Sequence, residues 1–364
     1  MSSPADHFIR RLGKGSYGTV DEVEVAGKRL ARKIYLEELC PSAIREVAFL
    51  TAVEHPNILR LERIDFTYSR TVVYLELASE RLVDLVYRGC SIAVACKVMH
   101  GILRGLQVLH QQGLVHGDLN PYNILMVGDV PKLADFGTVQ PPRQGARTTT
   151  IAWSSPEYLL RNQHSTATDM WSIGLIFYEW LSGVESWSTN EEESELLEKQ
   201  VKLVGCPDRG SLQLELSCEL HTYQPRKLDT LPAKHYTAFN VDKYKKDCDD
   251  LINGCLAFDP ESRWTVEQAL ASPLFSNFEQ PTTVWHKLEG VSTSSTESQR
   301  IFSDDRKARL FTTLMSGVED PSTDTIEAAS YIVRSTYGSS STCVRGQADE
   351  VRRLLALREY HLHL

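Results

Sequence analysis

The 364-residue sequence predicts an α+β fold in two parts, a small antiparallel β-sheet with one helix and then a larger helical part. Short runs of β-branched and aromatic residues between Phe8 and Leu77, such as residues 71–75, predict the sheet. After Ala78, apolar residues at helical spacing predict the second part. A Ser/Thr-rich stretch at 291–296 then predicts a linker before a helical extension.

Three helices stand out in the pattern. One is predicted to start at Ser42 and to stop before His55, which precedes a proline. Apolar residues at helical spacing over 98–109 predict a second helix that ends at Gly113, and the segment 171–181 is apolar nearly all round, as a central buried helix would be. The predicted boundaries are 8–78 for the first part, 79–275 for the second, 276–297 for the linker and 298–364 for the extension.

Composition narrows the classes of partner. The formal net charge is -9 and no stripe of Lys and Arg offsets it, so binding to nucleic acid is not expected. No run approaches the roughly 18–20 apolar residues of a membrane span, and the polar start lacks the features of a signal peptide. We therefore expect an intracellular protein, cytoplasmic or nuclear, that does not bind membranes. The 8 cysteines form no C-x-x-C pair, which fits a reducing compartment better than disulfides or zinc.

A glycine-rich segment lies between the first two predicted strands. Gly13, Gly15 and Gly18 follow the spacing G-x-G-x-x-G, and Val20 comes two residues later. Glycines have no Cβ, so the backbone N–H groups of such a loop can close over phosphates. Alone this signal is weak, because glycine-rich hairpins are common.

Lys33 follows this loop on a predicted strand, two residues after Ala31. A strand there would bring one ammonium group to the α- and β-phosphates of a nucleotide, while Ala31 leaves room for a purine. Glu46, on the next helix, is placed to hold Lys33 as an ion pair. Singly, both would be ordinary surface residues. Their order after the glycine loop favours a phosphate-binding site.

A second polar cluster has the sequence HGDLNPYNIL at 116–125 and is followed by Asp135-Phe136-Gly137. Asp118 supplies a carboxylate that can orient and deprotonate a hydroxyl group. Asn123 supplies an amide oxygen for a metal ion, and Asp135 a carboxylate for metal and phosphate oxygens. Each could be a turn residue by itself, but in this order they indicate phosphoryl transfer.

With these motifs, the region from Phe8 to Phe275 resembles the protein kinase superfamily throughout. Pro156-Glu157 downstream and Arg263, the partner of that glutamate in the family, agree with it. The sequence PSAIRE at 41–46 is one residue shorter than the cyclin-contacting helix signature of cyclin-dependent kinases, which the chain most resembles. The resemblance implies a bilobal protein kinase fold, ATP and Mg²⁺ as cofactors, and a protein substrate.

The resemblance also implies a role for each motif residue. Asp118 would be the base of the catalytic loop (116–123), Lys33 and Glu46 would position phosphates, and Asn123 and Asp135 would hold the metal. The nucleotide would be bound by Gly13, Gly15, Gly18, Val20, Ala31, Lys33, Glu76, Ala78 and Leu125, with hinge hydrogen bonds from Glu76 and Ala78.

Several departures concern the activation segment (135–157). In cyclin-dependent kinases three arginines hold a phosphothreonine there, because a nearly doubly charged anion needs charge-assisted donors. Of the three, Arg45 remains, whereas Gly117 and Gln140 replace the others and Gly145 stands at the phosphorylated position. We therefore predict that phosphorylation of this segment is not the on-switch.

Two further departures affect rate and specificity. Asn120 replaces the catalytic-loop lysine of Ser/Thr kinases, so it offers the γ-phosphate a hydrogen bond but no charge. Losing one preorganised donor costs on the order of 10²–10³ in rate, so slow turnover is expected. Ser154 replaces an arginine that shapes the proline-accepting pocket, so a preference for proline after the acceptor is not expected.

The extension is predicted to form two or three amphipathic helices. Residues 309–334 resemble the start of a cyclin box over a length too short for a whole one. A helical tail packed on the kinase or on a partner is the simpler interpretation. The family implies a cyclin partner on the helix Ser42–Glu46, and this extension is the intramolecular alternative.

Two other functions remain open at this point. One is a pseudokinase scaffold, in which Gly117 and Asn120 reflect relaxed chemical constraint. The other is a small-molecule kinase with an altered catalytic loop. A serine/threonine protein kinase is favoured, because a scaffold has no chemical need to keep the five residues Lys33, Glu46, Asp118, Asn123 and Asp135.

Overall fold

The computed structural model describes residues 6–15, 18–35, 41–67, 70–144, 151–183, 187, 191–206, 216, 220–224, 228 and 241–278. These residues belong to two compact units. Unit 1 holds the described residues up to Ala78 together with Asp135–Val139, and unit 2 holds those of Ser79–Ala134 and Gln140–Thr282. The predicted extension (298–364) and nearly all of the predicted linker lie outside the described residues.

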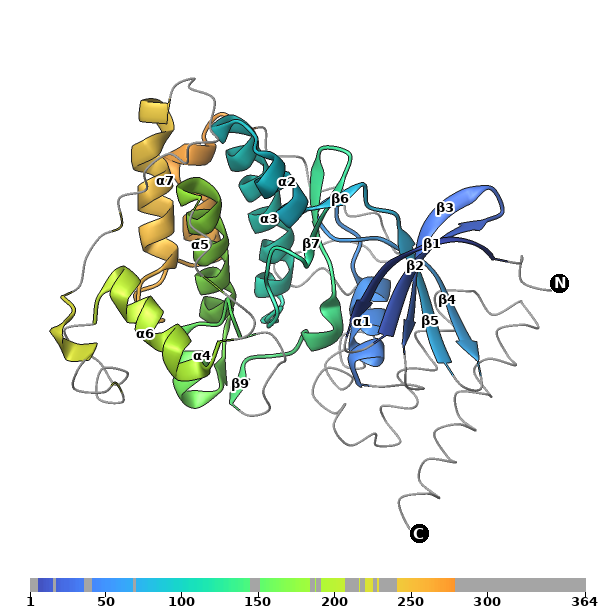
Figure 1. The fold of residues 1–364 in the computed structure, drawn as a ribbon, viewed down its shortest axis with the longest axis horizontal. Helices are drawn as coiled ribbons and strands as arrows, with labels where there is room; N and C mark the ends of the chain where they lie inside the picture. The colour runs from blue at the N-terminus through green and yellow to red at the C-terminus, as the bar shows by residue number, and fades with distance from the viewer. Residues whose placement is uncertain are drawn as a thin grey trace, which may run out of the picture. The chain divides into compact units, whose positions relative to one another are not determined.

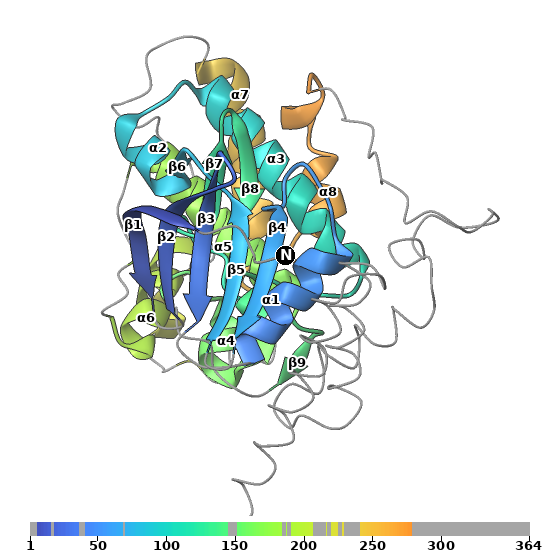
Figure 2. The ribbon, with the colours of Figure 1, turned by 90° about the vertical axis from the view of Figure 1, so that its right-hand side faces the viewer.

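Unit 1 is built on a five-stranded antiparallel sheet with the strand order β1-β2-β3-β5-β4 (Figures 1 and 2). The strands are β1 (His7–Gly15), β2 (Gly18–Val25), β3 (Lys28–Tyr35), β4 (Leu61–Thr67) and β5 (Arg70–Glu76). Helix α1 (Pro41–Ala52) lies next to β4, and the short turn η1 (Phe136–Thr138) packs against α1. The predicted antiparallel sheet with one helix is confirmed.

Two neighbouring rows of side chains across this sheet differ in chemistry. Lys33 pairs across the strands with Val20 and Val73, and Val73 with Ile64, so the row of Lys33 is otherwise apolar. Successive residues of a strand point to opposite faces, so the next row lies on the other face. That row is polar and consists of Arg11, Asp21, Arg32, Tyr74 and Arg63. An ammonium group in the apolar row needs a partner of opposite charge.

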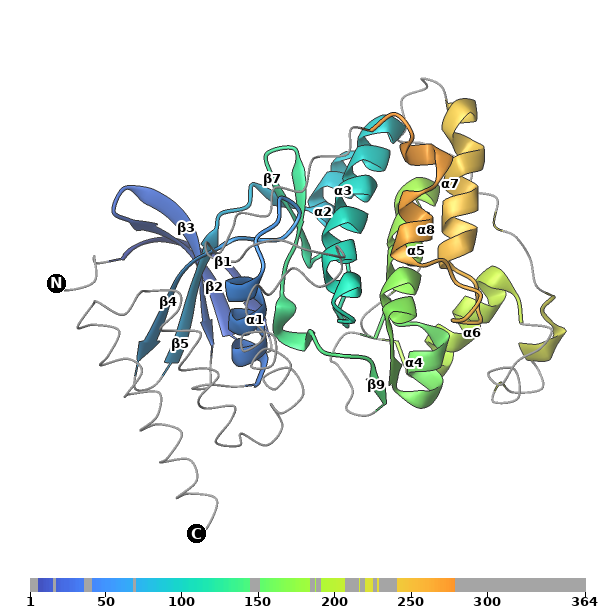
Figure 3. The ribbon, with the colours of Figure 1, turned by 180° about the vertical axis from the view of Figure 1, so that it is seen from behind.

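Unit 2 is mainly helical. Helix α5 (Thr166–Ser182) packs against both α3 (Ile92–Gln111) and α7 (Val241–Cys255), and α8 (Val266–Leu270) packs against α3 (Figures 1 and 3). Two small sheets have the strand orders β6-β7-β8 and β10-β9. The remaining elements are β6 (Glu80–Arg81), α2 (Leu82–Arg88), β7 (Ile124–Val127), β8 (Val130–Leu133), β9 (Arg143–Gln144), α4 (Pro156–Arg161), β10 (Gln163–His164), α6 (Glu193–Val204), η3 (Leu220–Thr222) and η4 (Pro273–Phe275).

The central helices confirm the periodicity argument and correct one expectation. Helix α3 covers the apolar segment 98–109, and Gly113 follows it with a φ of 67°. Helix α5 covers 171–181, and most of its residues are buried. By length and composition, α3 is apolar enough to cross a membrane. The expectation that no segment of the chain is so apolar was therefore wrong. Of its most apolar stretch, 72% is buried inside the protein, as in the core helix of a globular unit.

Candidate active site

In unit 1, a buried lysine joins the sheet to α1 and to the segment that begins at Asp135. The Lys33 Nζ donates to both carboxylate oxygens of Glu46, at 3.1 and 3.0 Å, and to the Asp135 Oδ1 at 3.0 Å. Lys33 is 9% exposed and Glu46 1% exposed. Strand β3 and helix α1 thus bring Lys33 to the glutamate that the sequence predicted as its partner.

Charge, rather than exposure to water, keeps Lys33 protonated. Burial, the largest single effect, would lower the pKa of its ammonium group. The negative charges of Asp135 and Glu46 outweigh burial and raise the pKa well above its ordinary value. Lys33 therefore presents a permanent positive charge, which is what the binding of nucleotide phosphates requires.

Asp135 has the backbone of a functional position. It is a non-glycine residue with a φ of 60° and a ψ of 74°. These angles lie in the left-handed region of backbone conformation, which residues with a Cβ rarely adopt. Such residues cost on the order of 1–3 kcal/mol and cluster at active sites. Its carboxylate is one third exposed, so it is open to solvent on one side while Lys33 holds the other.

The three residues of Asp135-Phe136-Gly137 are fixed against α1. The Phe136 ring stacks on the Phe49 ring with centroids 4.5 Å apart. The Arg45 Nη1 donates to the Gly137 carbonyl oxygen at 3.4 Å. A Cβ on Gly137 would lie 3.0 Å from the Ser42 Cβ, so glycine permits this close approach.

The predicted nucleotide residues of unit 1 lie along the sheet. Gly13 and Gly15 end β1 and Gly18 begins β2. A Cβ on Gly18 would lie 2.0 Å from the Ile34 carbonyl oxygen, whereas a Cβ on Gly13 or Gly15 would have no described neighbour within 4 Å. Packing therefore demands glycine at Gly18 alone of the three.

Val20, Ala31 and the end of β5 complete this face. Val20 pairs with Lys33 across β2 and β3, and Ala31 pairs with Leu75 in β5. Glu76 ends β5, and its carboxylate accepts from the Arg60 N–H at 2.7 Å. Ala78 ends the first segment of unit 1, and Leu125 lies in β7 of unit 2. The predicted adenine residues thus divide between the two units.

In unit 2, amide side chains hold Asp118. The Asn123 Nδ2 donates to the Asp118 Oδ2 at 2.9 Å, and the Asn120 Nδ2 donates to the Asp118 Oδ1 at 3.2 Å. The same two amides also donate to the Asp118 carbonyl oxygen, at 2.9 and 3.2 Å. The carboxylate is therefore oriented by neutral donors on both of its oxygens.

Asn120 also shapes the catalytic loop. It is 3% exposed, and its Oδ1 accepts the N–H groups of Tyr122 and Asn123 at 3.0 and 3.1 Å. This is an Asx-type turn, in which a short side chain caps the residues that follow it. The Asn120 Nδ2 donates to Asp118, so the hydrogen bond to a γ-phosphate that we predict from the sequence would compete with these two bonds.

Asp169 anchors the start of the loop from α5. Its carboxylate accepts the N–H groups of His116 and Gly117, at 2.8 and 3.0 Å, and bonds the His110 Nε2 at 2.9 Å. Gly117 has a φ of 79°, which glycine adopts without strain. Burial would raise the pKa of Asp169, but the hydrogen bond and charge of His110 and the backbone donors lower it.

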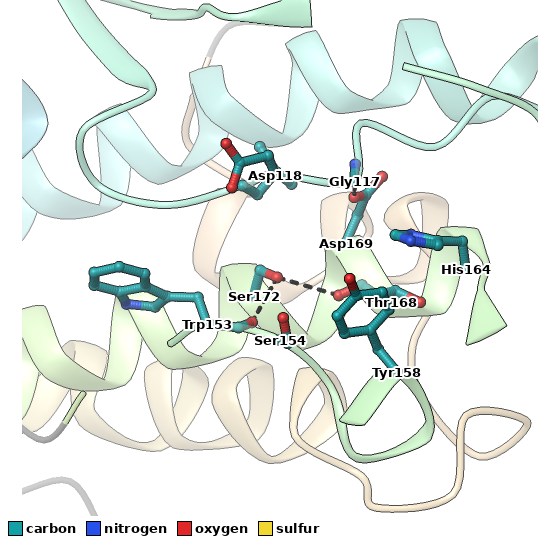
Figure 4. A pocket seen from close by; sticks show the side chains of 10 residues that line it. Gly117, Asp118, Trp153, Ser154, Tyr158, His164, Thr168, Asp169 and Ser172 are labelled. Atoms are coloured by element: carbon teal, nitrogen blue, oxygen red, sulfur yellow. Dashed lines mark hydrogen bonds between the residues drawn. The ribbon is translucent and has the colours of Figure 1, made fainter. Parts of the chain in front are cut away.

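A small pocket opens beside this loop (Figure 4). Asp118 and Gly117 lie on one side of it, and Ser154 and Tyr158 lie on the other. The Ser172 Oγ donates to the Trp153 carbonyl oxygen at 2.8 Å below it. The described lining includes two carboxylates and no Lys or Arg, and consists of Gly117, Asp118, Leu119, Trp153, Ser154, Tyr158, His164, Thr168, Asp169 and Ser172.

A buried ion pair closes the segment that follows. Arg263 donates through two nitrogens to the two carboxylate oxygens of Glu157, at 2.7 and 3.0 Å. Both side chains are almost fully buried. Arg263 also donates to the carbonyl oxygens of Ala257, Ala167 and Phe258. Each of the three guanidinium nitrogens therefore has a hydrogen-bond acceptor. The pair that the sequence predicted as structural is present.

Each predicted metal position offers an oxygen atom of the kind that Mg²⁺ prefers, Asn123 in unit 2 and Asp135 in unit 1. The Asn123 amide uses its nitrogen on Asp118, and its Oδ1 makes no hydrogen bond with the described residues, which leaves the oxygen for a ligand. Asp135 offers a carboxylate that is partly exposed. Mg²⁺ prefers such oxygens and takes its remaining ligands from water and phosphates.

One residue beside Lys33 and Glu46 was not predicted from the sequence. The Tyr35 hydroxyl donates to the Glu46 Oε2, and the Tyr35 ring is fully buried. Lys33 and Tyr35 are two residues apart on one predicted strand, which places them on one face, and this spacing is the signal that could have drawn attention to Tyr35. Of the predicted activation-segment positions, Gln140 is buried, and Gly145 lies outside the described residues.

Comparison with known proteins agrees with this geometry. A family model of the protein kinase domain matches residues 7–275. Cyclin-dependent kinase 14 of Oryctolagus cuniculus is 29% identical over 295 residues, which cover 76% of this chain and 62% of that protein, and that of Homo sapiens gives the same values. Cyclin-dependent kinase E-1 of Arabidopsis thaliana is 27% identical over 311 residues, covering 74% of this chain and 66% of that protein.

The chain therefore spans about 62% of the length of the cyclin-dependent kinase 14 proteins that it matches. The sheet of unit 1 and the helices of unit 2 correspond to the two lobes of the predicted fold. Because the matched region covers most of the sequence, this chain belongs to the protein kinase domain family.

Proposed function

We propose that this chain is an ATP- and Mg²⁺-dependent protein kinase that phosphorylates serine or threonine. The observation that carries the proposal is the buried Lys33, held between Glu46 and Asp135 with its positive charge enforced. A scaffold without nucleotide chemistry would gain nothing from keeping an ammonium group in an apolar row, where burial opposes its charge.

The catalytic loop supports the role of Asp118 as base. In the proposed reaction the acceptor hydroxyl gives its proton to the Asp118 carboxylate while its oxygen bonds the γ-phosphorus. The bond from that phosphorus to the β-phosphate oxygen breaks, and ADP leaves. Asn120 and Asn123 would hold Asp118 in a fixed orientation, which is where much of the catalytic benefit of a positioned base lies.

Lys33 would bind the α- and β-phosphates, and Asn123 and Asp135 would hold the metal through oxygen atoms. When bound, Mg²⁺ supplies positive charge that offsets the charge developing on the phosphate oxygens. The unused Asn123 Oδ1 and the partly exposed Asp135 carboxylate support this assignment.

Activation without phosphorylation of the activation segment is supported by the pocket beside Asp118. Its described lining carries Asp118 and Asp169 and no Lys or Arg, so a phosphate nearby would meet negative charge and no bidentate donor. The small residues Gly117 and Ser154 stand there in place of arginines. The same absence leaves no guanidinium to shape a proline site, so a proline preference is not proposed.

A partner on α1 is the least constrained part of the proposal. We place it on the helix Ser42–Glu46, and it is either a cyclin-like protein or the chain's own extension. Removal of the residues after Phe275 tests the second form. Loss of activity that an added extension peptide restores would support intramolecular docking, and full activity of the truncated chain would contradict it.

The experiment for the proposed function is transfer of labelled phosphate from ATP with Mg²⁺ to a degenerate peptide library. The chain is compared with Asp118→Asn, which keeps the shape of the base and removes its charge. Asp84→Asn, in an exposed ion pair with Arg81 in the same unit, is the matched control. Transfer to Ser and Thr by the chain and by Asp84→Asn, with none by Asp118→Asn, is expected.

Two outcomes would contradict the proposal. Nucleotide binding without transfer above the Asp118→Asn level would favour the pseudokinase. Transfer to a small molecule but to no peptide would favour a small-molecule kinase. The altered residues Gly117 and Asn120 make the first of these the main rival.

A further inference from the structure

The Tyr35 side chain lies in the lysine cluster, defined as Lys33, Tyr35, Glu46 and Asp135. Tyr35 is the last residue of β3, two residues after Lys33, so both side chains lie on the same face of the sheet. Its hydroxyl donates to the Glu46 Oε2, and the Lys33 Nζ lies 5.0 Å from the centre of its ring. It is 0% exposed.

In the part of the chain that the structure describes, the donors to the Glu46 carboxylate are the Lys33 ammonium and the Tyr35 hydroxyl. They differ in what else they bind. The ammonium is shared with Asp135 and, on the function proposed above, with the phosphates of a nucleotide. The hydroxyl has the carboxylate of Glu46 as its acceptor.

This difference matters when phosphates compete for Lys33. As the ammonium turns part of its hydrogen bonding toward phosphate oxygens, its hold on Glu46 weakens. Glu46 is almost fully buried, so its carboxylate needs a donor that stays in place. The Tyr35 hydroxyl is such a donor, because the rigid ring fixes its position. A neutral phenol also attracts phosphate oxygens less strongly than a charged ammonium group does.

We propose that Tyr35 is a positioning residue, whose hydroxyl holds Glu46 in place and through it fixes Lys33 for binding of nucleotide phosphates. The inference rests on the proposed function and adds a residue to it. Tyr35 itself touches neither substrate nor nucleotide in this scheme, and its whole effect passes through the carboxylate of Glu46.

The protonation of Tyr35 suits this role. Burial and then the negative charge of Glu46 raise the pKa of the phenol well above its ordinary value of 10. The hydroxyl therefore keeps its proton, and remains a donor, throughout the pH range of activity assays. Removing it should lower the rate by a similar factor at every pH between about 6 and 9, since no titration of Tyr35 falls there.

The test compares Tyr35→Phe with Tyr74→Phe. Both tyrosines are buried in the same sheet, and each substitution removes a hydroxyl that donates to a carboxylate outside it. The acceptor is Glu46 of α1 for Tyr35, and Asp6, just before β1, for Tyr74. A hydrogen bond to a charged group is worth about tenfold to a hundredfold in an equilibrium. We expect kcat/KM for ATP to fall about tenfold or more in Tyr35→Phe, with the KM for peptide unchanged, and to stay within about twofold in Tyr74→Phe.

A double-mutant cycle separates positioning from a general loss of structure. In a Glu46→Ala background the hydroxyl has no side-chain acceptor at position 46, so adding Tyr35→Phe should change kcat/KM for ATP by less than about twofold. A similar loss in both backgrounds, or no loss in the single variant, would overturn the inference. Thermal unfolding of all variants identifies any that fail to fold.

Binding of a fluorescent ATP analogue with Mg²⁺ keeps the inference separate from the proposed function. If the chain transfers no phosphate, the proposed function fails, and the analogue still reports on Tyr35. Weaker binding by Tyr35→Phe, with unchanged binding by Tyr74→Phe, supports the role in fixing Lys33. Equal binding by the chain and by both variants rejects it.

Discussion

Asp118 is oriented by neutral amides. The side-chain amides of Asn120 and Asn123 each donate a hydrogen bond to one of its carboxylate oxygens. A neighbouring ammonium group would favour the charged form of an acid and so reduce its tendency to take a proton. Amide donors fix the direction of the carboxylate with less of this effect, so Asn120 at a lysine position is compatible with a working base.

Gly18 is the glycine of its loop that packing requires, so its replacement by alanine should destabilise the sheet. In Gly18→Ala the new Cβ would meet the Ile34 carbonyl oxygen at 2.0 Å. Because that oxygen belongs to the backbone of β3, the strands must move apart near Lys33. We expect the free energy of unfolding in urea to fall by about 1–3 kcal/mol.

Gly15→Ala is the matched control for unfolding. A Cβ on Gly15 would have no neighbour within 4 Å among the described residues, and Gly15 lies at the end of a strand. Its unfolding free energy should stay within about 0.5 kcal/mol of the unchanged chain. Equal losses in Gly18→Ala and Gly15→Ala would contradict the packing argument.

Asp169 gives a prediction about acid stability. Its pKa is depressed in the folded protein, below the ordinary value of 3.8, because His110 and two backbone N–H groups outweigh the effect of burial. The stabilisation is therefore present above pH 3.8 and is lost as the pH falls through the lower, folded pKa.

Asp169→Asn should remove this component. At pH 7 the free energy of unfolding of the variant, measured in urea, should be lower by about 1.5–3 kcal/mol, the value of hydrogen bonds to a charged group. Below pH 4 its free energy of unfolding should fall less steeply than that of the unchanged chain. Asp129→Asn, at an exposed turn between β7 and β8 of the same unit, is the control. Parallel pH curves for the chain and Asp169→Asn would contradict the assignment.

At the scale of elements, α1 is fixed by the chain itself at three points. Glu46 bonds Lys33, Phe49 stacks on Phe136, and Arg45 donates to the Gly137 carbonyl oxygen. All three contacts lie within unit 1. The paired position of Lys33 and Glu46 therefore exists in the chain without any partner.

The pair of Glu157 and Arg263 joins α4 to the segment before α8. In Glu157→Ala the buried guanidinium would lose its counter-charge, and breaking such a pair costs about 3–5 kcal/mol. Arg263 lies 5.0 Å from the Trp171 ring centre, so tryptophan fluorescence in urea should follow the loss.

Glu198→Ala serves as the control for that measurement. Glu198 pairs with Lys202 on α6, and both side chains are about half exposed. Its removal should leave the unfolding curve nearly unchanged. If Glu157→Ala unfolded at the same urea concentration as Glu198→Ala, the buried pair would not stabilise the fold as argued.

The elements differ in how far the sequence predicts them. Helices α3 and α5 are long and strongly periodic, so apolar spacing predicts them well. The polar row that joins Arg11 to Arg63 could not be predicted, because it depends on the register of five strands, and register is a matter of tertiary pairing. We also underestimated the apolar length of α3 from the sequence, and that length reflects the position of α3 in a buried core.

The candidate site divides in the same way. Asp118, Asn123 and Asp135 were predicted because their chemistry requires fixed residue types at fixed spacing. The role of Asn120 as a brace for Asp118, and the contact of Tyr35 with Glu46, depend on where side chains point. Single-residue spacing does not carry that information, so both appeared with the structure.

Across the whole molecule, the candidate site of this kinase is organised by the chain's own buried contacts. The described lining of the pocket beside Asp118 consists of neutral side chains and the carboxylates of Asp118 and Asp169. The segment 145–150, which holds Thr148, Thr149 and Thr150, lies outside the described residues. Phosphorylation there is therefore best tested by activity.

The most direct measurement is the initial rate of γ-phosphate transfer to a Ser/Thr peptide by phosphatase-treated chain, with intact mass confirming that no phosphate remains. Asp118→Asn, treated alike, sets the background. We expect transfer that depends on Asp118 and stays within about twofold of the untreated rate. A rate at the Asp118→Asn background, with the nucleotide still bound, would contradict it.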